Sequence, residues 1–384
     1  MGKIKVLQVN KLYYPETGGI ERTVQNIAEG LCEKTDMQVL VCQKKGKSIA
    51  ETVNGIRVFR SHSFGVLFSM PISFSFLLNL RRMAREQDIL QFHMPFPLGD
   101  LGCLLSGYKG KVVTYWHSDV VKQKKFMILY RPIMERFLKR ADVILVGAQG
   151  IIDGSEYLKP YREKCRVVPF AVSEDIWQDG EKYLEEKKQR QEETDQAEGL
   201  NFLFVGRLVY YKGCDVLLEA MKYVKRGHLT MIGTGVLENV LKERCKELQL
   251  EDRITFAGQQ SDEELKQGFR DMDVFILPSV ARSEAFALVQ LEAMAYGKPV
   301  INTNLPSGVP DVSLHGVTGR TVEPGDARAL ADAMNWMTDH PQETLAYGLA
   351  AKKRVDQVFT LKKILPQIYH VYEELLEEKT EVRS

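Results

Sequence analysis

The sequence predicts an α/β protein with two similar halves, each built on a parallel β-sheet. Apolar, β-branched segments alternate with helical patterns along most of the 384 residues, which is typical of parallel sheets covered by helices. The strand candidates of the first half are IKVLQVN, MQVLVCQ, IRVFRSH, ILQFH, KVVTYWHS, DVILVGA and CRVVPFA. Those of the second half are NFLFVGR, HLTMIGT, RITFAGQ, DVFILPS and PVINTN.

Composition places the domain boundaries. Residues 1–172 form the first predicted domain and residues 201–360 the second, because residues 173–200 contain an almost wholly polar and charged run that reads as a linker or an exposed helix. The apolar spacing after residue 361 predicts a last helix. The chain length accommodates two domains of this size.

Charge and cysteine usage narrow the class of protein. The six cysteines have no CxxC spacing, so a disulfide framework or a cysteine metal site is not expected, and a cytoplasmic location fits. We find neither a secretory signal nor a membrane-spanning segment. Residues 1–172 carry 26 Lys and Arg against 15 Asp and Glu, a formal charge of +11. This half either faces a negative partner, such as an anionic lipid, or attracts the acidic second half.

A pair of glycines precedes the first predicted helix. Gly18 and Gly19, in the segment TGGIE, follow the first strand. Glycine lets the backbone approach a ligand closely, and the free amides at a helix start favour a phosphate. A tight structural turn explains the two glycines equally well.

Two cations follow the first strand of the second half. The segment GRLVYYKG, residues 206–213, precedes the helix CDVLLEAM. Arg207 and Lys212 are therefore expected at the carboxyl edge of the sheet, where α/β proteins bind ligands. They suit a diphosphate and could neutralise charge on a departing nucleotide. A surface pair of charges is the alternative interpretation.

Two carboxylates lie eight residues apart in PSVARSEAFALVQLEAMAYGKP. A helix beginning near Phe286 places Glu284 just before it and Glu292 inside it. These carboxylates can accept hydrogen bonds from sugar hydroxyls. The free amides of Phe286, Ala287 and Leu288 at the helix start can donate to a sugar oxygen or a phosphate. For Glu284, a charge that merely stabilises the helix start is the alternative.

In this order, these segments resemble the retaining glycosyltransferases of family 4, which have the GT-B fold. The family's GGxE loop matches residues 18–21, its GRxxxxKG matches residues 206–213, and its E-x7-E matches Glu284 and Glu292. Its closing signatures match GKP at 297–299 and GVTG at 316–319. The resemblance covers nearly the whole chain. It implies two Rossmann-like, doubly wound domains facing across a cleft, with the carboxyl-terminal helix, about residues 361–384, packing back on the first.

The resemblance also implies residue roles, with an acceptor-side first domain and a donor-binding second domain. Arg207 and Lys212 would bind the donor's diphosphate, Glu284 the sugar hydroxyls and Glu292 the ribose. His117, at the end of an apolar strand, matches the family's histidine near the transferred sugar. The expected catalytic residues are His117, Glu284, Arg207 and Lys212. The expected donor-binding residues are Gly18, Gly19, Gly206, Gly233, Gly258, Phe286, Ala287, Leu288 and Glu292.

One histidine and one glutamate complete the predicted site. His93 ends another strand of the first half, and we expect it on the acceptor side together with Glu21. The sequence departs from the family at Ala287 and Ala285, where glycine is common. A methyl group there could crowd the backbone approach to the sugar.

No metal or cofactor is expected. Asp271-Met272-Asp273 resembles a metal-binding DxD motif, but it lies where a predicted helix meets a strand, so we interpret Asp273 as a helix-end residue. Arg207 and Lys212 could replace a metal electrostatically.

Two segments suit contact with an anionic membrane. Residues 121–140 interleave basic and apolar side chains, and residues 72–85 are apolar and end in Arg81, Arg82 and Arg85. Helices packed on the first sheet with solvated basic faces are the alternative for both. We therefore expect a cytoplasmic protein that can lie on the inner face of the membrane, and we expect no nucleic-acid partner.

The sequence thus predicts a retaining, metal-independent hexosyltransferase. It would move a hexose, with mannose a candidate, from a nucleotide diphosphate sugar to a glycan or lipid-linked acceptor in bacterial surface polysaccharide biosynthesis. The protein would mainly position both substrates and stabilise charge. A nucleotide-sugar epimerase of the same fold and a non-catalytic sugar-nucleotide binding protein remain alternatives. A Rossmann oxidoreductase would need G-x-G-x-x-G, which GGIERT does not supply.

Overall fold

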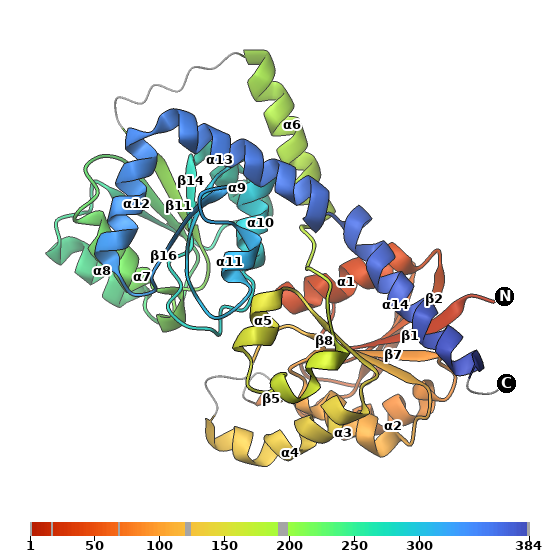
Figure 1. Ribbon diagram of the computed structural model, residues 1–384. Helices are drawn as coiled ribbons and strands as arrows, with labels where there is room; N and C mark the ends of the chain where they lie inside the picture. Colours follow the sequence, from red (N-terminus) through yellow and green to blue (C-terminus); the bar gives the residue numbers. More distant parts are fainter. Residues whose placement is uncertain (1, 17, 68–69, 120–123, 191–198, 382–384) are drawn as a thin grey trace. The chain divides into compact units, whose positions relative to one another are not determined.

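The structure is a computed structural model that describes residues 2–16, 18–67, 70–119, 124–190 and 199–381. The chain divides into two compact units (Figure 1). Unit 1 comprises Met1–Gly147, Ser155–Phe170 and Leu361–Ser384, and unit 2 comprises Ala148–Gly154 and Ala171–Thr360. The sequence placed one boundary at residue 172, whereas the chain enters unit 2 first at Ala148–Gly154 and again at Ala171.

Unit 1 is built on an eight-stranded sheet in the order β10-β9-β8-β7-β1-β2-β4-β3. All neighbouring strands are parallel except β3 and β4. The central strands are uninterrupted apolar runs because both faces of a parallel sheet are covered. The strands are β1 Ile4–Val9, β2 Thr35–Cys42, β3 Ile49–Val53, β4 Ile56–Ser61, β7 Ile89–Met94, β8 Lys111–Trp116, β9 Val143–Val146 and β10 Cys165–Val167, with a short hairpin of β5 Val66–Leu67 and β6 Met70–Pro71.

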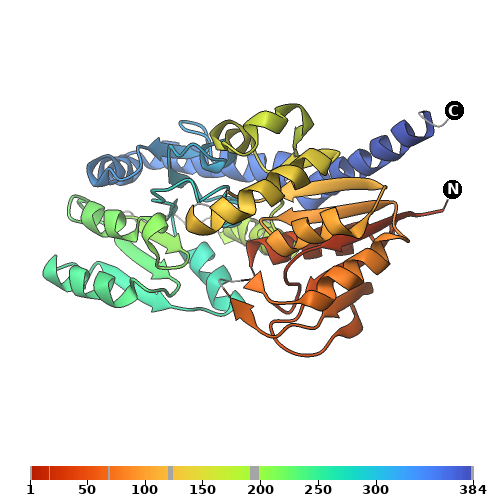
Figure 2. The same cartoon turned by 90° about the horizontal axis from the view of Figure 1, so that it is seen from below.

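Within the described residues, five α-helices cover this sheet. Helices α1 (Gly19–Leu31) and α14 (Leu361–Glu381) pack together on one side. Helices α2 (Phe74–Ala84), α3 (Pro97–Ser106) and α4 (Lys124–Arg140) lie side by side on the other, coloured orange to yellow in Figure 2. The segment after residue 361 therefore belongs to unit 1 although it follows unit 2 in the chain.

Unit 2 has a six-stranded parallel sheet in the order β13-β12-β11-β14-β15-β16. The order reverses between β11 and β14, the point at which open α/β sheets bind ligands at the carboxyl ends of their strands. The strands are β11 Asn201–Val205, β12 His228–Ile232, β13 Ile254–Gly258, β14 Val274–Ile276, β15 Val300–Thr303 and β16 Gly319–Val322. The helices are α5 Gln149–Gly154, α6 Glu174–Arg190, α7 Cys214–Met221, α8 Glu238–Glu247, α9 Asp262–Asp271, α10 Leu288–Ala295, α11 Val309–Val312, α12 Ala327–Asp339 and α13 Pro341–Arg354.

Helix α6 occupies most of residues 173–200, for which the sequence left a linker and an exposed helix open. Gly180 packs so closely on α10 that a Cβ atom there would lie 2.5 Å from the carbonyl oxygen of Ala295. The ring centroids of Tyr183 and Tyr296 are 6.0 Å apart. Residues 174–190 are thus an integral helix of unit 2, and its polar outer face explains the charged composition. Residues 191–198 lie outside the described part of the chain.

Candidate functional site

Glycines bring three loops together at the carboxyl edge of the unit 2 sheet. Gly206 follows β11, and its amide donates to the carbonyl of Ile232 at 2.9 Å. Gly233 has a φ of +128°, and a Cβ atom there would lie 2.1 Å from the oxygen of Gly206. The Gly233 amide donates in turn to Gly258 at 2.7 Å. Of the three expected donor-binding glycines, only Gly233 makes a backbone contact that a Cβ atom would prevent. Gly206 and Gly258 also have positive φ, +159° and +69°, which favours glycine.

The cations of GRLVYYKG occupy different environments. Lys212 is buried, whereas Arg207 is exposed and donates from Nη2 to the hydroxyl of Tyr211 at 3.0 Å. Gly213, with a φ of +67°, lies against the carbonyl of Pro278, which a Cβ atom would approach to 2.0 Å. This contact fixes the loop after β11 beside the loop after β14.

Lys212 and Glu284 meet at this point. Lys212 Nζ lies 2.6 Å from Glu284 Oε2, and both side chains are about 90% buried. The Ser279 hydroxyl donates to the same carboxylate oxygen at 3.1 Å, and Thr303 Oγ1 donates to the Ser279 carbonyl at 2.6 Å. The pair therefore holds one cation and one hydrogen-bond acceptor in fixed positions, as recognition of a charged, hydroxyl-rich ligand requires.

The segment between the two carboxylates differs from its predicted form. Helix α10 begins at Leu288 rather than near Phe286, so Phe286 and Ala287 precede it. Ala287 is left-handed, with φ 58° and ψ 76°. Glu292 lies within α10 and is half-buried. In the first turn of α10 the Gln290 amide donates to the Ala287 carbonyl at 3.0 Å, whereas the first amides of a helix generally have no intrahelical acceptor.

In unit 1, the glycine pair forms the start of α1. A Cβ atom on Gly18 would lie 2.3 Å from Glu21 Oε2, so Gly18 makes room for that carboxylate. Glu21 is buried and lies 3.9 Å from Lys11 Nζ. Gly19 is the first residue of α1. Glu21 thus contacts its own loop.

The two predicted histidines contact each other. His93 lies in β7, His117 directly follows β8, and His93 Nδ1 is 2.9 Å from His117 Nε2. His117 also stacks on Phe170, with ring centroids 4.9 Å apart. His93 is fully buried, which corrects its placement on the acceptor side: it supports His117 and offers no surface to an acceptor.

Burial keeps both rings neutral. Desolvation lowers the pKa of His93 to about 3. It also lowers the pKa of His117 well below its usual value, and the nearby His93 and Lys11 lower it further. An uncharged His117 can donate or accept one hydrogen bond at its free nitrogen.

Several residues of both clusters were absent from the sequence prediction. They are Gln8, Gln91 and Tyr372 beside the histidines, and Ser279 and Thr303 beside Glu284. Gln8 and Gln91 left a signal, because each interrupts an apolar strand. The others have no local signature.

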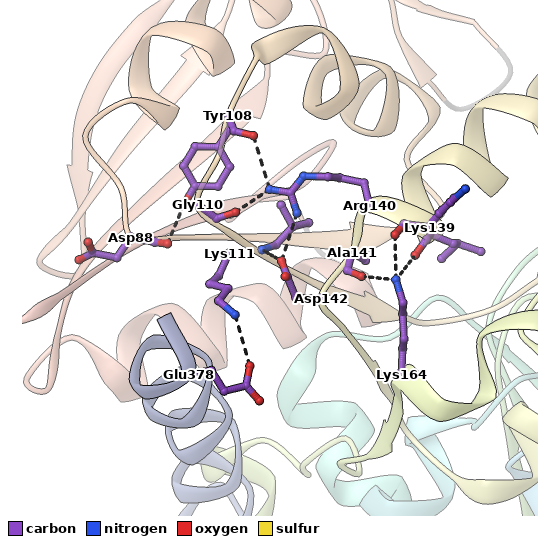
Figure 3. Close-up of polar contacts among 12 residues, drawn as sticks. Asp88, Tyr108, Gly110, Lys111, Lys139, Arg140, Ala141, Asp142, Lys164 and Glu378 are labelled. Atoms are coloured by element: carbon purple, nitrogen blue, oxygen red, sulfur yellow. Dashed lines mark hydrogen bonds and ion pairs between the residues drawn. The ribbon is translucent and has the colours of Figure 1, made fainter. Parts of the chain in front are cut away.

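A hollow of about 400 Å³ in unit 1 lies away from the carboxyl ends of the strands, where the candidate site residues are found. It lies at the amino ends of β8 and β9, between Tyr108, Lys111, Arg140 and Asp142 (Figure 3). Arg140 donates to Asp142 at 3.1 Å and to the Gly110 carbonyl at 2.5 Å. These contacts join the loops before β8 and β9, so the guanidinium here has a structural role.

No group of His, Cys, Asp and Glu side chains suited to a metal ion occurs within the described ranges. Asp273 Oδ2 accepts from the amide of Asn201 at 2.8 Å, as a residue between helix and strand does. Among the same residues, no helix combines the length and hydropathy that a membrane span requires.

Comparisons with known proteins agree with this geometry. The family described as "Glycosyltransferase Family 4" matches residues 17–175, and "Glycosyl transferases group 1" matches residues 185–354. O-antigen chain mannosyltransferase C of Escherichia coli is 30% identical over 383 residues, covering 98% of this chain and 100% of that protein. D-rhamnosyltransferase WbpZ of Pseudomonas aeruginosa is 34% identical over 388 residues, covering 99% and 98%.

Solved structures show the same fold at low identity. Anabaena HepE in complex with UDP superposes with a TM-score of 0.74 at 18% identity, covering 97% of this chain and 100% of that one. Sucrose-phosphate synthase from Thermosynechococcus elongatus gives 0.75 at 19% identity, covering 98% and 100%. With two Rossmann-like units and full-length relatives among the glycosyltransferases, the chain belongs to glycosyltransferase family 4 and has the GT-B fold.

Proposed function

We propose that the protein transfers a hexose, either mannose or a relative such as D-rhamnose, from a nucleotide diphosphate sugar to a growing bacterial surface polysaccharide. Its relatives over the full length are an O-antigen mannosyltransferase and a D-rhamnosyltransferase. Glycan or lipid-linked acceptors fit that class. Retention at the anomeric carbon and independence of metals and cofactors are part of the proposal.

The observation that carries the proposal is the buried Lys212–Glu284 pair at the point where the unit 2 sheet reverses its order. We assign Lys212 and Arg207 to the donor's diphosphate, Glu284 to the sugar hydroxyls and Glu292 to the ribose. Lys212 and Glu284 neutralise each other. A donor supplies each with a new partner, so its binding does not leave either charge buried alone.

The test is transfer by conservative variants of this pair. We expect Glu284→Gln and Lys212→Gln to lower kcat/KM at least about 100-fold, because each removes a fixed charge at the reacting centre. The measurement is release of nucleotide from GDP-mannose, GDP-D-rhamnose and UDP-sugars, with and without acceptor glycan. Release that requires an acceptor indicates transfer, whereas isomerised sugar nucleotide without an acceptor indicates an epimerase.

Glu219→Gln is the matched control. Glu219 forms exposed ion pairs with Lys222 and Arg244 in unit 2, and exposed pairs contribute little to stability. This variant keeps wild-type turnover. Near-normal turnover by Glu284→Gln would contradict the assignment of this site. Thermal melting verifies that each variant is folded.

We further propose that unit 1 contacts an anionic membrane surface. Large apolar side chains are exposed along the helix layer of α2, α3 and α4 and the β5–β6 hairpin. They are Phe64, Val66, Leu67, Ile72, Phe74, Leu78, Leu105, Ile128 and Leu129. Exposed Arg81, Arg82 and Arg85 continue the same stripe of α2. Residues 120–123 of the predicted basic segment lie outside the described part.

Vesicle sedimentation tests this surface. We expect binding to vesicles that contain about a quarter phosphatidylglycerol, weaker binding at higher salt and little binding to pure phosphatidylcholine. Replacing Ile128 and Leu129 with Ser should reduce binding, because both side chains are more than 70% exposed. The matched control replaces the exposed Leu345 and Leu349 of unit 2 with Ser. Equal binding by both double variants would exclude this face as the contact surface.

A further inference from the structure

A line of buried polar side chains crosses the sheet of unit 1 from α14 to His117. It passes through Tyr372, Gln8 and His93. Each of these three is fully buried. Strand geometry aligns them, since Gln8 pairs with Gln91 in register, and residues two apart in a strand, such as Gln91 and His93, share a face. Polar groups in such a core require partners. Here they supply one another, except that Gln91 Nε2 has no hydrogen-bond partner in the described part of the chain.

The hydrogen bonds along this line have one direction. Tyr372 donates to Gln91 Oε1, and Gln8 Nε2 donates to the Tyr372 hydroxyl at 3.2 Å. Gln8 therefore presents Oε1 to His93 Nε2, 2.8 Å away, which must carry the proton. Because His93 is neutral, its Nδ1 accepts, and His117 Nε2 at 2.9 Å must donate.

This direction fixes the proton on His117. With Nε2 protonated, Nδ1 of a neutral imidazole carries a lone pair. Nδ1 has no hydrogen-bond partner in the described part of the chain, and the residue retains 8% exposure. Stacking on Tyr115 and Phe170, with centroids 5.2 and 4.9 Å away, holds the plane of the ring.

We infer that Tyr372 of α14, acting through Gln8 and His93, sets the tautomer of His117 so that its Nδ1 accepts a hydrogen bond from a sugar hydroxyl. Tyr372, Gln8 and His93 are positioning residues, and His117 is the group that touches the substrate. The inference rests on the proposed function for the identity of the ligand. The tautomer itself is a property of the free protein.

This hydrogen-bond arrangement gives selectivity for a hydroxyl group at one position of the ligand, which charge alone does not supply. A fixed acceptor at Nδ1 selects a ligand that offers a hydroxyl donor at that point and disfavours one that offers only an ether or carbonyl oxygen. It discriminates between sugars that carry a hydroxyl there and deoxy sugars that lack it.

The experiment reads the tautomer by NMR on the full-length protein labelled with ¹⁵N-histidine. The chain has seven histidines, and His117→Asn identifies the His117 signal. We expect neutral His93 and His117 with the proton on Nε2. Tyr372→Phe removes the acceptor of Gln8, so we expect a mixture of tautomers at His117 and a roughly threefold to tenfold lower kcat/KM.

Tyr369→Phe is the control on the same helix. Tyr369 is half-buried and lies over Lys34, outside the polar line, so this variant should keep the wild-type tautomer and rate. A proton on Nδ1 of His117 in the wild type, or an unchanged tautomer in folded Tyr372→Phe, would overturn the inference. If no variant or wild type transfers sugar while the tautomers behave as stated, the proposed function fails and the inference about the proton stands.

Discussion

Ala287 shows at the scale of one residue how this chain departs from the motif it resembles. Its φ of 58° lies in the left-handed region, which costs an L-residue with a side chain about 1–2 kcal/mol. Glycine, common at this position in the family, avoids that cost. The departure seen in the sequence therefore corresponds to backbone strain next to the start of α10, a feature that no residue pattern displays.

We expect Ala287→Gly to raise the free energy of unfolding by about 0.5–1 kcal/mol. The relief of the left-handed strain is partly offset by the larger entropy of glycine in the unfolded chain. Chemical denaturation of the two proteins measures the difference.

Ala293→Gly is the matched control. Ala293 is buried within α10 in right-handed helix, where glycine costs about 1 kcal/mol. Replacing Ala with Gly at these two positions, six residues apart, should therefore change the free energy of unfolding in opposite directions. Destabilisation by both would show that the backbone at Ala287 is not strained.

The sequence predicted those site residues that belong to a contiguous motif. Arg207 and Lys212 lie in the loop that follows the buried strand β11, and Lys212 pairs there with Glu284, because loops after parallel strands gather at the carboxyl edge of the sheet. The roles assigned to these residues stay predictions. Ser279 and Tyr372 were missed. Tyr372 contacts Gln91, which is 281 positions away in the chain, and a single sequence does not show such a pair. Ser279 lies five residues from its partner Glu284 in the same loop, but a serine there has no distinctive pattern.

At the scale of elements, the contact of α3 with α4 depends on a protonated carboxyl group. The Tyr130 hydroxyl of α4 donates to Asp100 of α3. Burial raises the pKa of Asp100 to about 8, although the Tyr130 hydrogen bond opposes the rise. The second oxygen, Oδ1, has no hydrogen-bond partner in the described part of the chain.

This carboxyl group should make stability fall with rising pH. Asp100 ionises near pH 4 in an unfolded chain and near pH 8 in the folded one. Between these values the folded protein binds more protons, so the free energy of unfolding falls as pH rises from about 4 to about 8. Asp100→Asn removes this term. As pH rises through this interval, the free energy of unfolding of the variant relative to that of the wild type should increase by up to about 1.4 kcal/mol per pH unit.

Urea denaturation at pH 5, 6.5 and 8 measures the effect. Asp332→Asn, an exposed position on α12, serves as the control and should follow the wild-type pH dependence. An Asp100→Asn variant with the wild-type slope would mean that the buried carboxyl group is ionised at neutral pH.

Most strands were predictable because their apolar runs are long. Four short strands, β3, β5, β6 and β16, were not predicted. β3 (Ile49–Val53) is exposed over most of its length and pairs only at the sheet edge with β4, so it has no apolar signature. β16 (Gly319–Val322) is four residues long. The start of α10 moved from Phe286 to Leu288 because Ala287 takes a left-handed turn.

For the whole molecule, the sequence predicted two domains and a last helix, but not the contribution of that helix to the core. Helix α14 supplies the buried Ile368, Val371, Tyr372 and Leu375. Apolar spacing predicts the helix and the family resemblance predicts that it packs on the first domain, but neither indicates which strands it contacts. The pairing with β1 and β7 is a contact of high sequence separation, because Gln8 and Tyr372 are 364 positions apart in the chain.

We expect a chain ending at Thr360 to lose the stability of unit 1 and keep that of unit 2. Removal of α14 exposes apolar surface worth several kcal/mol and leaves Gln8 without its hydroxyl partner. Hydrogen exchange measures both units at once. Amides of β1 and β7 should lose protection, while those of β11 and β14 should retain it and serve as the internal control. Equal loss in both sheets would show that the two units unfold as one.

The discontinuity of unit 1 also affects the order in which the ribosome completes the two units. Residues 171–360 of unit 2 emerge as one block and can fold during synthesis. Unit 1 begins first, yet its helix α14 emerges only after that whole block. Until α14 emerges, the side of the unit 1 sheet that α14 contacts stays uncovered, including Gln8 and Gln91. A chaperone that recognises exposed apolar strands would bind the nascent chain during this interval.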